Sequence, residues 1–290
     1  MGRAGGHGQS TESAPSLYVV ATPIGNLADI TLRALEVLKS VDLVAAEDTR
    51  VTARLLAHYG IDVPVIALHE HNERRAAQRV LQALREGKSA ALVTDAGTPG
   101  ISDPGAAAVA EVREAGYRVV PLPGANAAVC AISAAGSPAE HFLFYGFLPA
   151  QPGARRRELA RLKAHTFLLV FYEAPHRVVA SVTDMAAELG AARRITITRE
   201  LTKMFESIHV CALGDAATWL EADPNRIKGE FALLVEGAPD DPHDSAADMP
   251  RVLAALMREL PLKQAVKLAA EITGARKNDV YELALKSRQE

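Results

Sequence analysis

The stretch Leu17-Tyr18-Val19-Val20-Ala21-Thr22-Pro23-Ile24-Gly25-Asn26 joins a compact apolar run to a loop of small residues. A short run of this kind, closed by Pro and Gly, is typical of a buried strand. From Ile30 to Leu38 the apolar residues take helical spacing. A buried strand that leads into a helix predicts the first crossover unit of a parallel sheet.

The same alternation continues through the first half of the chain. Further strands are expected at Leu43–Ala46, Val65–Leu68, Ala90–Thr94 and Arg118–Pro121. Helices are expected between them at Val51–Tyr59, Arg74–Arg85 and Ala106–Ala115. Strands that alternate with helices of about 10–15 residues predict an α/β domain with a mainly parallel sheet.

A second α/β block follows a break at Phe147–Gly153, which we interpret as a link between domains. Its expected elements are strands at Phe167–Tyr172, Ile195–Thr198, Ser207–Ala212 and Phe231–Glu236, and a helix at Val178–Leu189. The second and third of these strands lie close enough along the chain to be antiparallel neighbours. This predicts a mixed sheet.

We therefore expect five segments along the chain. They are a disordered N-terminal extension (1–16), two α/β domains (17–146 and 147–237), a flexible Pro- and Asp-rich linker (238–249) and a helical region (250–290). Within the last segment, Gly274 stands at the turn of an expected helix-turn-helix, and Arg276 and Lys277 open its second helix. This hairpin either contacts nucleic acid or serves only in packing or dimerisation.

The composition excludes several classes of protein. The 290 residues carry 32 Lys and Arg against 35 Asp and Glu, a formal charge of −3, which argues against coating nucleic acid by bulk charge but not against a local basic patch. Two cysteines make neither a disulfide framework nor a four-ligand zinc site, and we expect no metal. With no signal peptide and no membrane-length apolar run, we expect a cytoplasmic protein.

Four short motifs were tested against well-known enzyme classes, and each fails. Gly87-Lys88-Ser89 lacks the upstream Gly of a P-loop, because that position is Gln82. No G-x-G-x-x-G follows the first strand, and Pro104 stands where a nucleophile elbow needs its second Gly. His69-Glu70-His71 lacks the i, i+4 spacing of a zincin helix. The sequence motifs therefore do not indicate a kinase, a dehydrogenase or a hydrolase.

Three loops rich in Gly and Pro stand directly after expected strands. They are Thr22–Asn26, Asp95–Gly105 and Pro121–Ala127. In open α/β sheets, ligands bind outside the carboxyl ends of the strands. Small residues there let a ligand reach the backbone, which larger side chains would cover. The three loops together predict a binding site in the first half of the chain.

These loops also carry a resemblance to a known family. Val20–Thr31, Ala46–Arg50, Thr94–Gly105 and Pro121–Ala127 resemble motifs of the ribosomal RNA small-subunit methyltransferase I family, one of the tetrapyrrole-methylase-like (class III) S-adenosylmethionine methyltransferases. The resemblance continues in order through Gly146–Pro149, Phe171–Arg177, Arg199–Lys203 and Lys228–Glu230. It covers Leu17 to Gly237, and the tail is also similar.

The resemblance implies a fold, a reaction and a cofactor site. It implies two α/β domains of the tetrapyrrole-methylase type with S-adenosylmethionine in the cleft between them, and a homodimer that 2′-O-methylates the ribose of a cytidine in 16S rRNA of the small ribosomal subunit. The cofactor residues that it implies are Thr22, Pro23, Ile24, Gly25, Asp95, Ala96, Gly97, Thr98, Ile101, Ser102, Asn126, Ala127 and Tyr172. The superfamily often has Gly-Asp-Pro where this chain has Gly97-Thr98-Pro99, which leaves open whether Asp95 supplies the missing acidic contact.

Methyl transfer from a sulfonium to a hydroxyl is an in-line displacement, which needs alignment and a base near the oxygen. The candidate bases are Glu47, Glu173, His176, Glu200 and Lys203, the last only if its pKa is lowered. Spacing alone leaves open that these residues form loop-closing or surface ion pairs instead.

Cations are needed to hold RNA. The segment 155–163 carries five basic residues and one acid. We expect phosphate contacts from Arg155, Arg156, Arg157, Arg161, Arg177, Arg276 and Lys277. The alternative is a solvated helix face.

Two other functions stay open beside the 16S rRNA methyltransferase. One is methylation of a ring carbon of a corrin or porphyrin, as elsewhere in the superfamily. The other is a non-catalytic RNA-binding factor for ribosome assembly.

Overall fold

The computed structural model describes residues 14–69, 71–239 and 244–286. The chain divides into two units, Met1–Gly237 and Ala238–Glu290, and each is considered on its own. Most of the extension expected over 1–16 lies outside the described residues, but Ser16 already begins the first strand. Among the described residues, no helix is both long and apolar enough to cross a bilayer.

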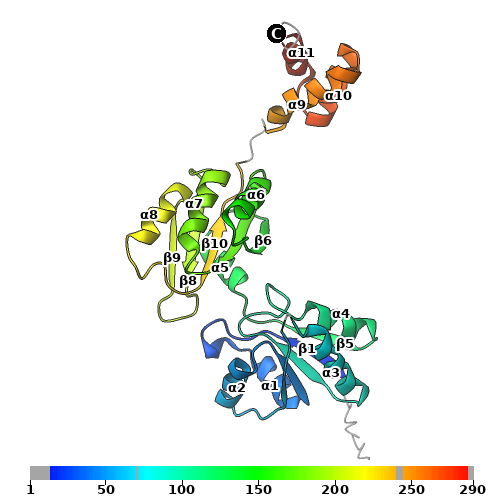
Figure 1. Ribbon diagram of the computed structural model, residues 1–290, viewed down its shortest axis with the longest axis vertical. Helices are drawn as coiled ribbons and strands as arrows, with labels where there is room; N and C mark the ends of the chain where they lie inside the picture. Colours follow the sequence, from blue (N-terminus) through cyan, green and yellow to red (C-terminus); the bar gives the residue numbers. More distant parts are fainter. Residues whose placement is uncertain (1–13, 70, 240–243, 287–290) are drawn as a thin grey trace, which may run out of the picture. The chain divides into compact units, whose positions relative to one another are not determined.

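The first sheet is parallel throughout, as the strand–helix alternation predicts. Its strands are β1 (Ser16–Val20), β2 (Leu43–Ala46), β3 (Val65–Ala67), β4 (Ala90–Val93) and β5 (Arg118–Leu122). They stand in the order β3-β2-β4-β1-β5. The helices between them are α1 (Leu32–Ser40), α2 (Thr49–His58), α3 (Glu73–Arg85) and α4 (Ala106–Glu114), with a short 3-10 turn, η1 (Leu27–Asp29) (Figure 1).

Helices cover both faces of this sheet, because alternate strand residues point to opposite sides. Val44 and Ala46 pack in one core with residues of α1 and α2. Ala45, between them, packs in a second core with residues of α3 and α4. The strands are therefore apolar at consecutive positions, as a parallel sheet requires.

The second sheet is mixed. Its strands are β6 (Phe142–Phe147), β7 (Leu168–Glu173), β8 (Arg194–Arg199), β9 (Ser207–Ala212) and β10 (Phe231–Val235), in the order β6-β7-β10-β8-β9. The β8 and β9 strands pair antiparallel, which confirms that expectation. Three helices, α6 (Pro152–Leu162), α7 (Val178–Leu189) and α8 (Ala216–Glu221), share one core with this sheet, and η2 (Leu213–Asp215) precedes α8.

The domain boundary expected between residues 146 and 147 is wrong. One strand and one helix that precede it belong with the second sheet. The β6 strand pairs in parallel with β7 and so belongs to the second sheet. Helix α5 (Ala127–Ala135) packs with β7 and β10 on the opposite face from α6 to α8. The chain therefore passes from the first sheet to the second at the end of β5. The Pro- and Gly-containing segment after β6 is a strand-to-helix turn rather than a link between domains.

The second unit is a small helical array with its own core. Its helices are α9 (Asp244–Glu259), α10 (Leu262–Thr273) and α11 (Lys277–Lys286), packed around Leu253, Val266, Ala269, Val280 and Ala284. Gly274 ends α10 at φ 68° and makes the turn into α11, as the sequence predicts. The linker expected over 238–249 is too long, because α9 already begins at Asp244; residues 240–243 lie outside the described part.

Candidate active site

Three loops are tied together at the carboxyl ends of the strands in the first sheet. Thr22 and Gly97 exchange backbone hydrogen bonds of 2.9 and 3.0 Å. The buried Thr22 hydroxyl donates to the Thr94 carbonyl at 2.9 Å, and the Thr98 hydroxyl donates to the Ala125 carbonyl at 3.0 Å. The loops after β1, β4 and β5 therefore form one assembly.

The loop after β4 needs unusual backbone angles. Gly97, Gly100 and Gly105 have φ of 89°, 80° and 131°, where side chains are disfavoured. A Cβ at Gly105 would also overlap Leu92. Ser102 adopts φ 67° as a non-glycine residue, a conformation that the surrounding structure must enforce. The resulting bends place Ser102 and Asp103 beside two cavities.

One cavity of about 400 Å³ lies between these loops and the second sheet. This volume falls in the range of roughly 300–1,000 Å³ that small-molecule sites occupy. Most of the residues expected to hold the cofactor line it: Ile24, Ala96, Gly97, Thr98, Ile101, Ser102, Asn126, Ala127 and Tyr172. Asp103, Phe147, Glu173, Ala174, Pro175, Leu201, Glu230, Phe231 and Ala232 complete the lining. We call it the cofactor cavity.

The other four expected cofactor residues do not line this cavity. Thr22 is buried and holds the loop after β4 through the bonds described above. Gly25 is exposed, and any Cβ there would overlap the side chain of Lys203. Asp95 accepts a hydrogen bond from the Asp48 backbone N–H at 2.9 Å. Pro23 is half-buried. These residues shape the loops behind the cavity wall.

Polar groups in the cofactor cavity are oriented by local bonds. The Tyr172 hydroxyl accepts a hydrogen bond from the Ala128 N–H at 3.0 Å, which leaves its own hydrogen free to donate. Burial raises the pKa of Tyr172, against the effect of the Ala128 N–H, so the phenol stays protonated at neutral pH. The Asn126 Oδ1 caps α5 by accepting from the Val129 N–H at 3.0 Å. Its amide NH2 is therefore the group that it offers to a ligand.

Three carboxylates gather at the ends of the neighbouring strands β2 and β4. The Asp95 N–H donates to the Glu47 Oε2 at 3.3 Å. Burial raises the pKa of Glu47; this Asp95 N–H opposes the rise, and the charges of Asp95 and Asp48 add to it. Burial, together with the charges of Glu47 and Asp95, raises the pKa of Asp103 to about 6. Asp103 is not among the site residues predicted from the sequence, although it belongs to the loop after β4.

Of the five candidate bases, Glu173 is held by its neighbours although it lines the cofactor cavity. Its side chain is 1% exposed and accepts from the Ser181 hydroxyl at 2.5 Å and from the Ala174 N–H at 2.8 Å. Arg177 donates to it as well. His176 is exposed and does not line the cofactor cavity. These contacts fit a structural role for Glu173, and His176 lies outside the lining of the cofactor cavity.

Glu200 and Lys203 form an ion pair, the alternative that spacing left open. The Lys203 Nζ donates to the Glu200 Oε1 and the Glu230 Oε2, both at 2.9 Å. Burial would lower the pKa of Lys203, but these two hydrogen bonds outweigh it and raise the pKa. Burial would raise the pKa of Glu200, and the hydrogen bonds from Lys203 and the Glu230 N–H instead lower it. The condition set for Lys203 as a base, a lowered pKa, is therefore not met.

The expected RNA contacts divide into buried and exposed arginines. Arg155 is wrong as a phosphate contact: it is 3% exposed, and its Nε and Nη2 donate to the Asp184 Oδ2 at 2.7 and 2.6 Å. Arg177 is partly buried and donates to the Leu148 carbonyl at 2.6 Å. Arg155 joins α6 to α7, and Arg177 ties the start of α7 to the ends of β6 and β7.

The remaining cations stay accessible. Arg156 also bonds Asp184, and Arg161 bonds Glu158, but their side chains are 56% and 74% exposed. Arg157, Arg276 and Lys277 are exposed. These five retain the charge that contact with phosphate needs.

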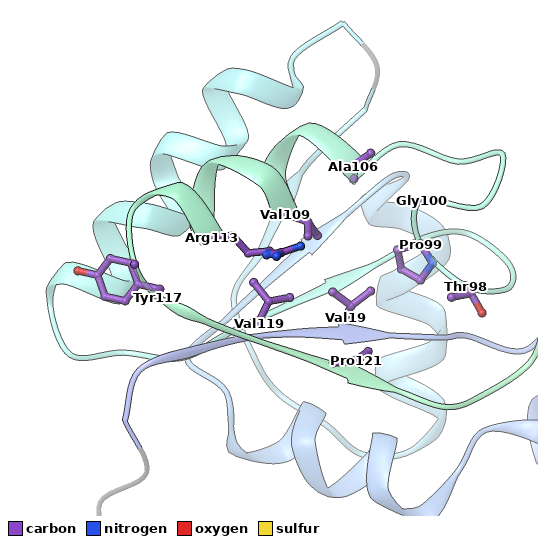
Figure 2. A pocket seen from close by; sticks show the side chains of 12 residues that line it. Val19, Thr98, Pro99, Gly100, Ala106, Val109, Arg113, Tyr117, Val119 and Pro121 are labelled. Atoms are coloured by element: carbon purple, nitrogen blue, oxygen red, sulfur yellow. The ribbon is translucent and has the colours of Figure 1, made fainter.

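A further cavity of about 700 Å³ lies away from the carboxylates, against β1, β5 and α4. Figure 2 shows Arg113 extending from α4 over the sheet surface that Val19 and Val119 form. The walls are mostly aliphatic, and Tyr117 closes one end. It is larger than the cofactor cavity. Of the loops after β1, β4 and β5, only the loop after β4 lines it, through Thr98, Pro99, Gly100 and Gly105. No cluster of metal-ligating side chains is found among residues 14–69, 71–239 and 244–286.

Two α/β domains, with a cavity at the carboxyl ends of the strands in the first sheet, match a known class of methylases. Residues 16–217 match the family model of tetrapyrrole (corrin/porphyrin) methylases, and residues 243–288 match the model described as the RsmI C-terminal HTH domain. A curated relative from Escherichia coli O157:H7, ribosomal RNA small subunit methyltransferase I, is 51% identical and aligns over 97% of this chain and 99% of its own length. The chain belongs to the ribosomal RNA small subunit methyltransferase I family.

Solved structures confirm the fold. A cobalt-precorrin-4 methyltransferase matches 78% of this chain and 96% of its own, with a TM-score of 0.59 and 18% identity. A uroporphyrin-III C-methyl transferase from Thermus thermophilus, complexed with S-adenyl homocysteine, matches 76% and 96%, with a TM-score of 0.52 and 18% identity. This chain is a methyltransferase.

Proposed function

We propose that this protein transfers the methyl group of S-adenosylmethionine to the ribose 2′-hydroxyl of a cytidine in 16S rRNA, within the small ribosomal subunit. The observation that carries this proposal is the cofactor cavity. It combines small-residue backbone at Gly97 and Ala127 with the oriented polar groups of Asn126 and Tyr172. A cavity built in this way suits a ligand with both apolar and polar parts.

The residues of the cofactor cavity would bind and shield the donor. Ile24, Ile101, Phe147 and Leu201 supply apolar wall that excludes water. The bound donor supplies an electrophilic methyl carbon on a sulfonium. The chain's part is to align an acceptor oxygen with that carbon, since alignment of the reacting atoms lowers the barrier of such a displacement.

The RNA substrate would be held by exposed cations rather than by overall charge. Arg156, Arg157 and Arg161 lie on α6, and Arg276 and Lys277 open α11 of the second unit. Each cation that neutralises a phosphate adds about 0.7–0.9 to the slope of log affinity against log salt. Cations on two units would let one enzyme contact separate strands of a folded RNA.

We also propose that the protein acts as a homodimer in the cytoplasm. Apolar side chains are exposed on and before the edge strand β9, with Met204 at 91% and Phe205 at 67% exposed and Ile208 and Val210 beside them. Exposed apolar patches mark interaction surfaces. Sedimentation of the wild type and of Phe205→Ser tests this: a dimer that F205S weakens is expected, and a wild-type monomer at micromolar concentration would refute it.

The test of function uses labelled S-adenosylmethionine with three acceptors: undermethylated small subunits, naked 16S rRNA and a porphyrin precursor. We expect label on cytidine ribose in the small subunit. Label on the porphyrin alone would identify the tetrapyrrole methylase instead. Binding to subunits without any transfer would identify a non-catalytic assembly factor.

A further inference from the structure

Three arginines lie on the exposed side of α3, close to its start: Arg74, Arg75 and Arg79. Ala76 and Val80, which stand between them in the sequence, are buried in the core of the first sheet. The helix is therefore held by its apolar side and presents the three cations to solvent. These arginines are not among the RNA contacts predicted from the sequence.

None of the three pairs with an acid in the part of the chain that the structure describes. The acid of the first turn, Glu73, is used elsewhere: its Oε1 accepts from the backbone N–H groups of Gly105 and Ala107 at 2.9 and 2.8 Å. On α6, in contrast, Arg156 and Arg161 each bond a carboxylate. The cations of α3 are thus free to meet an anion from outside.

The cluster does not help the helix to fold. Arg75 and Arg79 stand four residues apart and are neighbours on the helix surface, where two like charges repel and destabilise the helix. Glu111 of α4 reaches the same surface but bonds Gln78, at 2.8 Å. The repulsion between the arginines is relieved when a polyanion binds them.

A row of cavities begins at the cofactor cavity and runs toward these arginines. A second cavity, of about 750 Å³, shares Ser102 and Asp103 with the cofactor cavity. A third, of about 400 Å³, shares His71 and Glu73 with the second. Cavities that share lining residues adjoin one another, so the surface is hollowed step by step away from the cofactor.

The far end of the row lies against the cations. Arg74 and Arg75 line the third cavity. A fourth, of about 230 Å³, shares Asn72 and Arg75 with the third and reaches Arg79. The arginines therefore flank a path that ends where the methyl donor would lie.

We propose that Arg74, Arg75 and Arg79 bind the phosphates of the 16S rRNA strand that carries the target nucleotide, and that this strand follows the row of cavities to the cofactor. This inference rests on the proposed function. Guanidinium groups bind phosphate oxygens in a bidentate manner. Phosphate contacts set the position of a strand without reading its bases. The row ends at the cofactor cavity, so the polyanion that it suits is the methyl acceptor.

The first test measures the salt dependence of binding of the full-length protein to naked 16S rRNA. Arg75→Gln combined with Arg79→Gln removes two phosphate contacts, so the slope of log affinity against log salt should fall by about 1.4–1.8. R75K/R79K keeps both charges and should keep most of the slope. The matched control is R85Q/R118Q, which removes two exposed charges that line none of these cavities.

The control fixes what counts against the proposal. R85Q/R118Q should change the slope by less than about 0.5. An unchanged slope in R75Q/R79Q would overturn the proposal, and so would an equal fall in the control, because the effect would then be one of overall charge. Thermal unfolding should show R75Q/R79Q at least as stable as the wild type, since a repulsion is removed. A clear loss of stability would make these arginines structural and overturn their assignment to RNA.

The second test uses single-turnover methylation of undermethylated small subunits. In R75Q/R79Q the subunit concentration that gives half the maximal rate should rise about tenfold or more, with the Kd for S-adenosylmethionine within about twofold of the wild type. A variant that binds the donor poorly would place the arginines at the cofactor and overturn the proposal.

The outcomes separate this surface from the proposed function. A wild type that methylates no subunit refutes the function, while the salt slopes on naked RNA still decide whether the arginines bind phosphate. A wild type that methylates, beside an R75Q/R79Q variant with normal slope and normal half-saturation, overturns the surface alone. An effect on subunits without any effect on naked RNA would identify a ribosomal protein as the partner and overturn the assignment to RNA.

Discussion

Replacing Arg155 by Ala should destabilise the first unit strongly, because Arg155 is a buried partner of Asp184. The variant loses two short charge-assisted bonds, at 2.7 and 2.6 Å, and a weaker one from Nη1 to the Ala150 carbonyl at 3.3 Å. Asp184 stays behind with a side chain only 5% exposed. Its remaining ion-pair partner is Arg156, whose side chain is 56% exposed.

Removing one partner of a buried ion pair costs about 3–5 kcal/mol, since Asp184 then stays buried with only the exposed Arg156 to compensate its charge. For a unit of this size, that loss lowers the unfolding temperature by about 6–20 °C. The matched control is Arg157→Ala, on the same helix and exposed, which should change stability by less than about 0.5 kcal/mol. Urea unfolding followed by circular dichroism measures both variants.

The same pair of variants separates structural from RNA-binding arginines. Below its unfolding temperature, R155A should keep the salt dependence of RNA binding, whereas R157A should reduce the salt slope by about 1. A stable R155A with a reduced slope would refute the assignment of Arg155 to the core. That result would indicate that the whole segment 155–163 binds phosphate.

Three further changes probe other parts of the structure. Tyr172→Phe removes a hydroxyl that lines the cofactor cavity and is free to donate, together with its bond from the Ala128 N–H. Calorimetry should show the Kd for S-adenosylmethionine rising about 5–10-fold; an unchanged Kd would mean that this hydroxyl does not contact the cofactor. Lys203→Met should cost at most about 1 kcal/mol at pH 7. Because the pKa of Glu200 is lowered by that pair, this loss should vanish as the pH falls below about 4; a loss that persists there would contradict the ion pair. The double variant R276A/K277A should reduce the salt slope of RNA binding by about 2 without changing donor binding, and an intact slope would leave the helix-turn-helix a packing element.

The sequence predicted most of the fold, because consecutive apolar residues mark strands buried on both faces. One exception is the boundary between the two sheets. Gly146 stands at φ 80°, and the pairing of β6 with β7 shifts register just before it. This irregular strand, followed at once by prolines and glycines, has the composition of a link. Its pairing partner begins twenty residues later, at Leu168, so only the folded structure shows that β6 is a strand of the second sheet.

The sequence predicted which loops form the site better than it predicted which side chains act there. The carboxyl ends of parallel strands meet at one edge, so the Gly- and Pro-rich loops converge as expected. Arg155 was misassigned because charge was counted along the chain. Helical spacing places Arg155 with the buried Leu159 and Leu162, and that pattern was readable. Asp103 was missed because Asp before Pro looks like an ordinary turn residue.

The most direct test asks whether the protein methylates the ribose 2′-oxygen of a cytidine in 16S rRNA. Small subunits from cells that lack the methylation, incubated with the protein and S-adenosylmethionine, can be digested and their 16S rRNA nucleosides separated by mass spectrometry. We predict a new 2′-O-methylcytidine, absent when the protein or S-adenosylmethionine is left out. A methyl group found on a base, on another nucleoside, or only on a tetrapyrrole would contradict it.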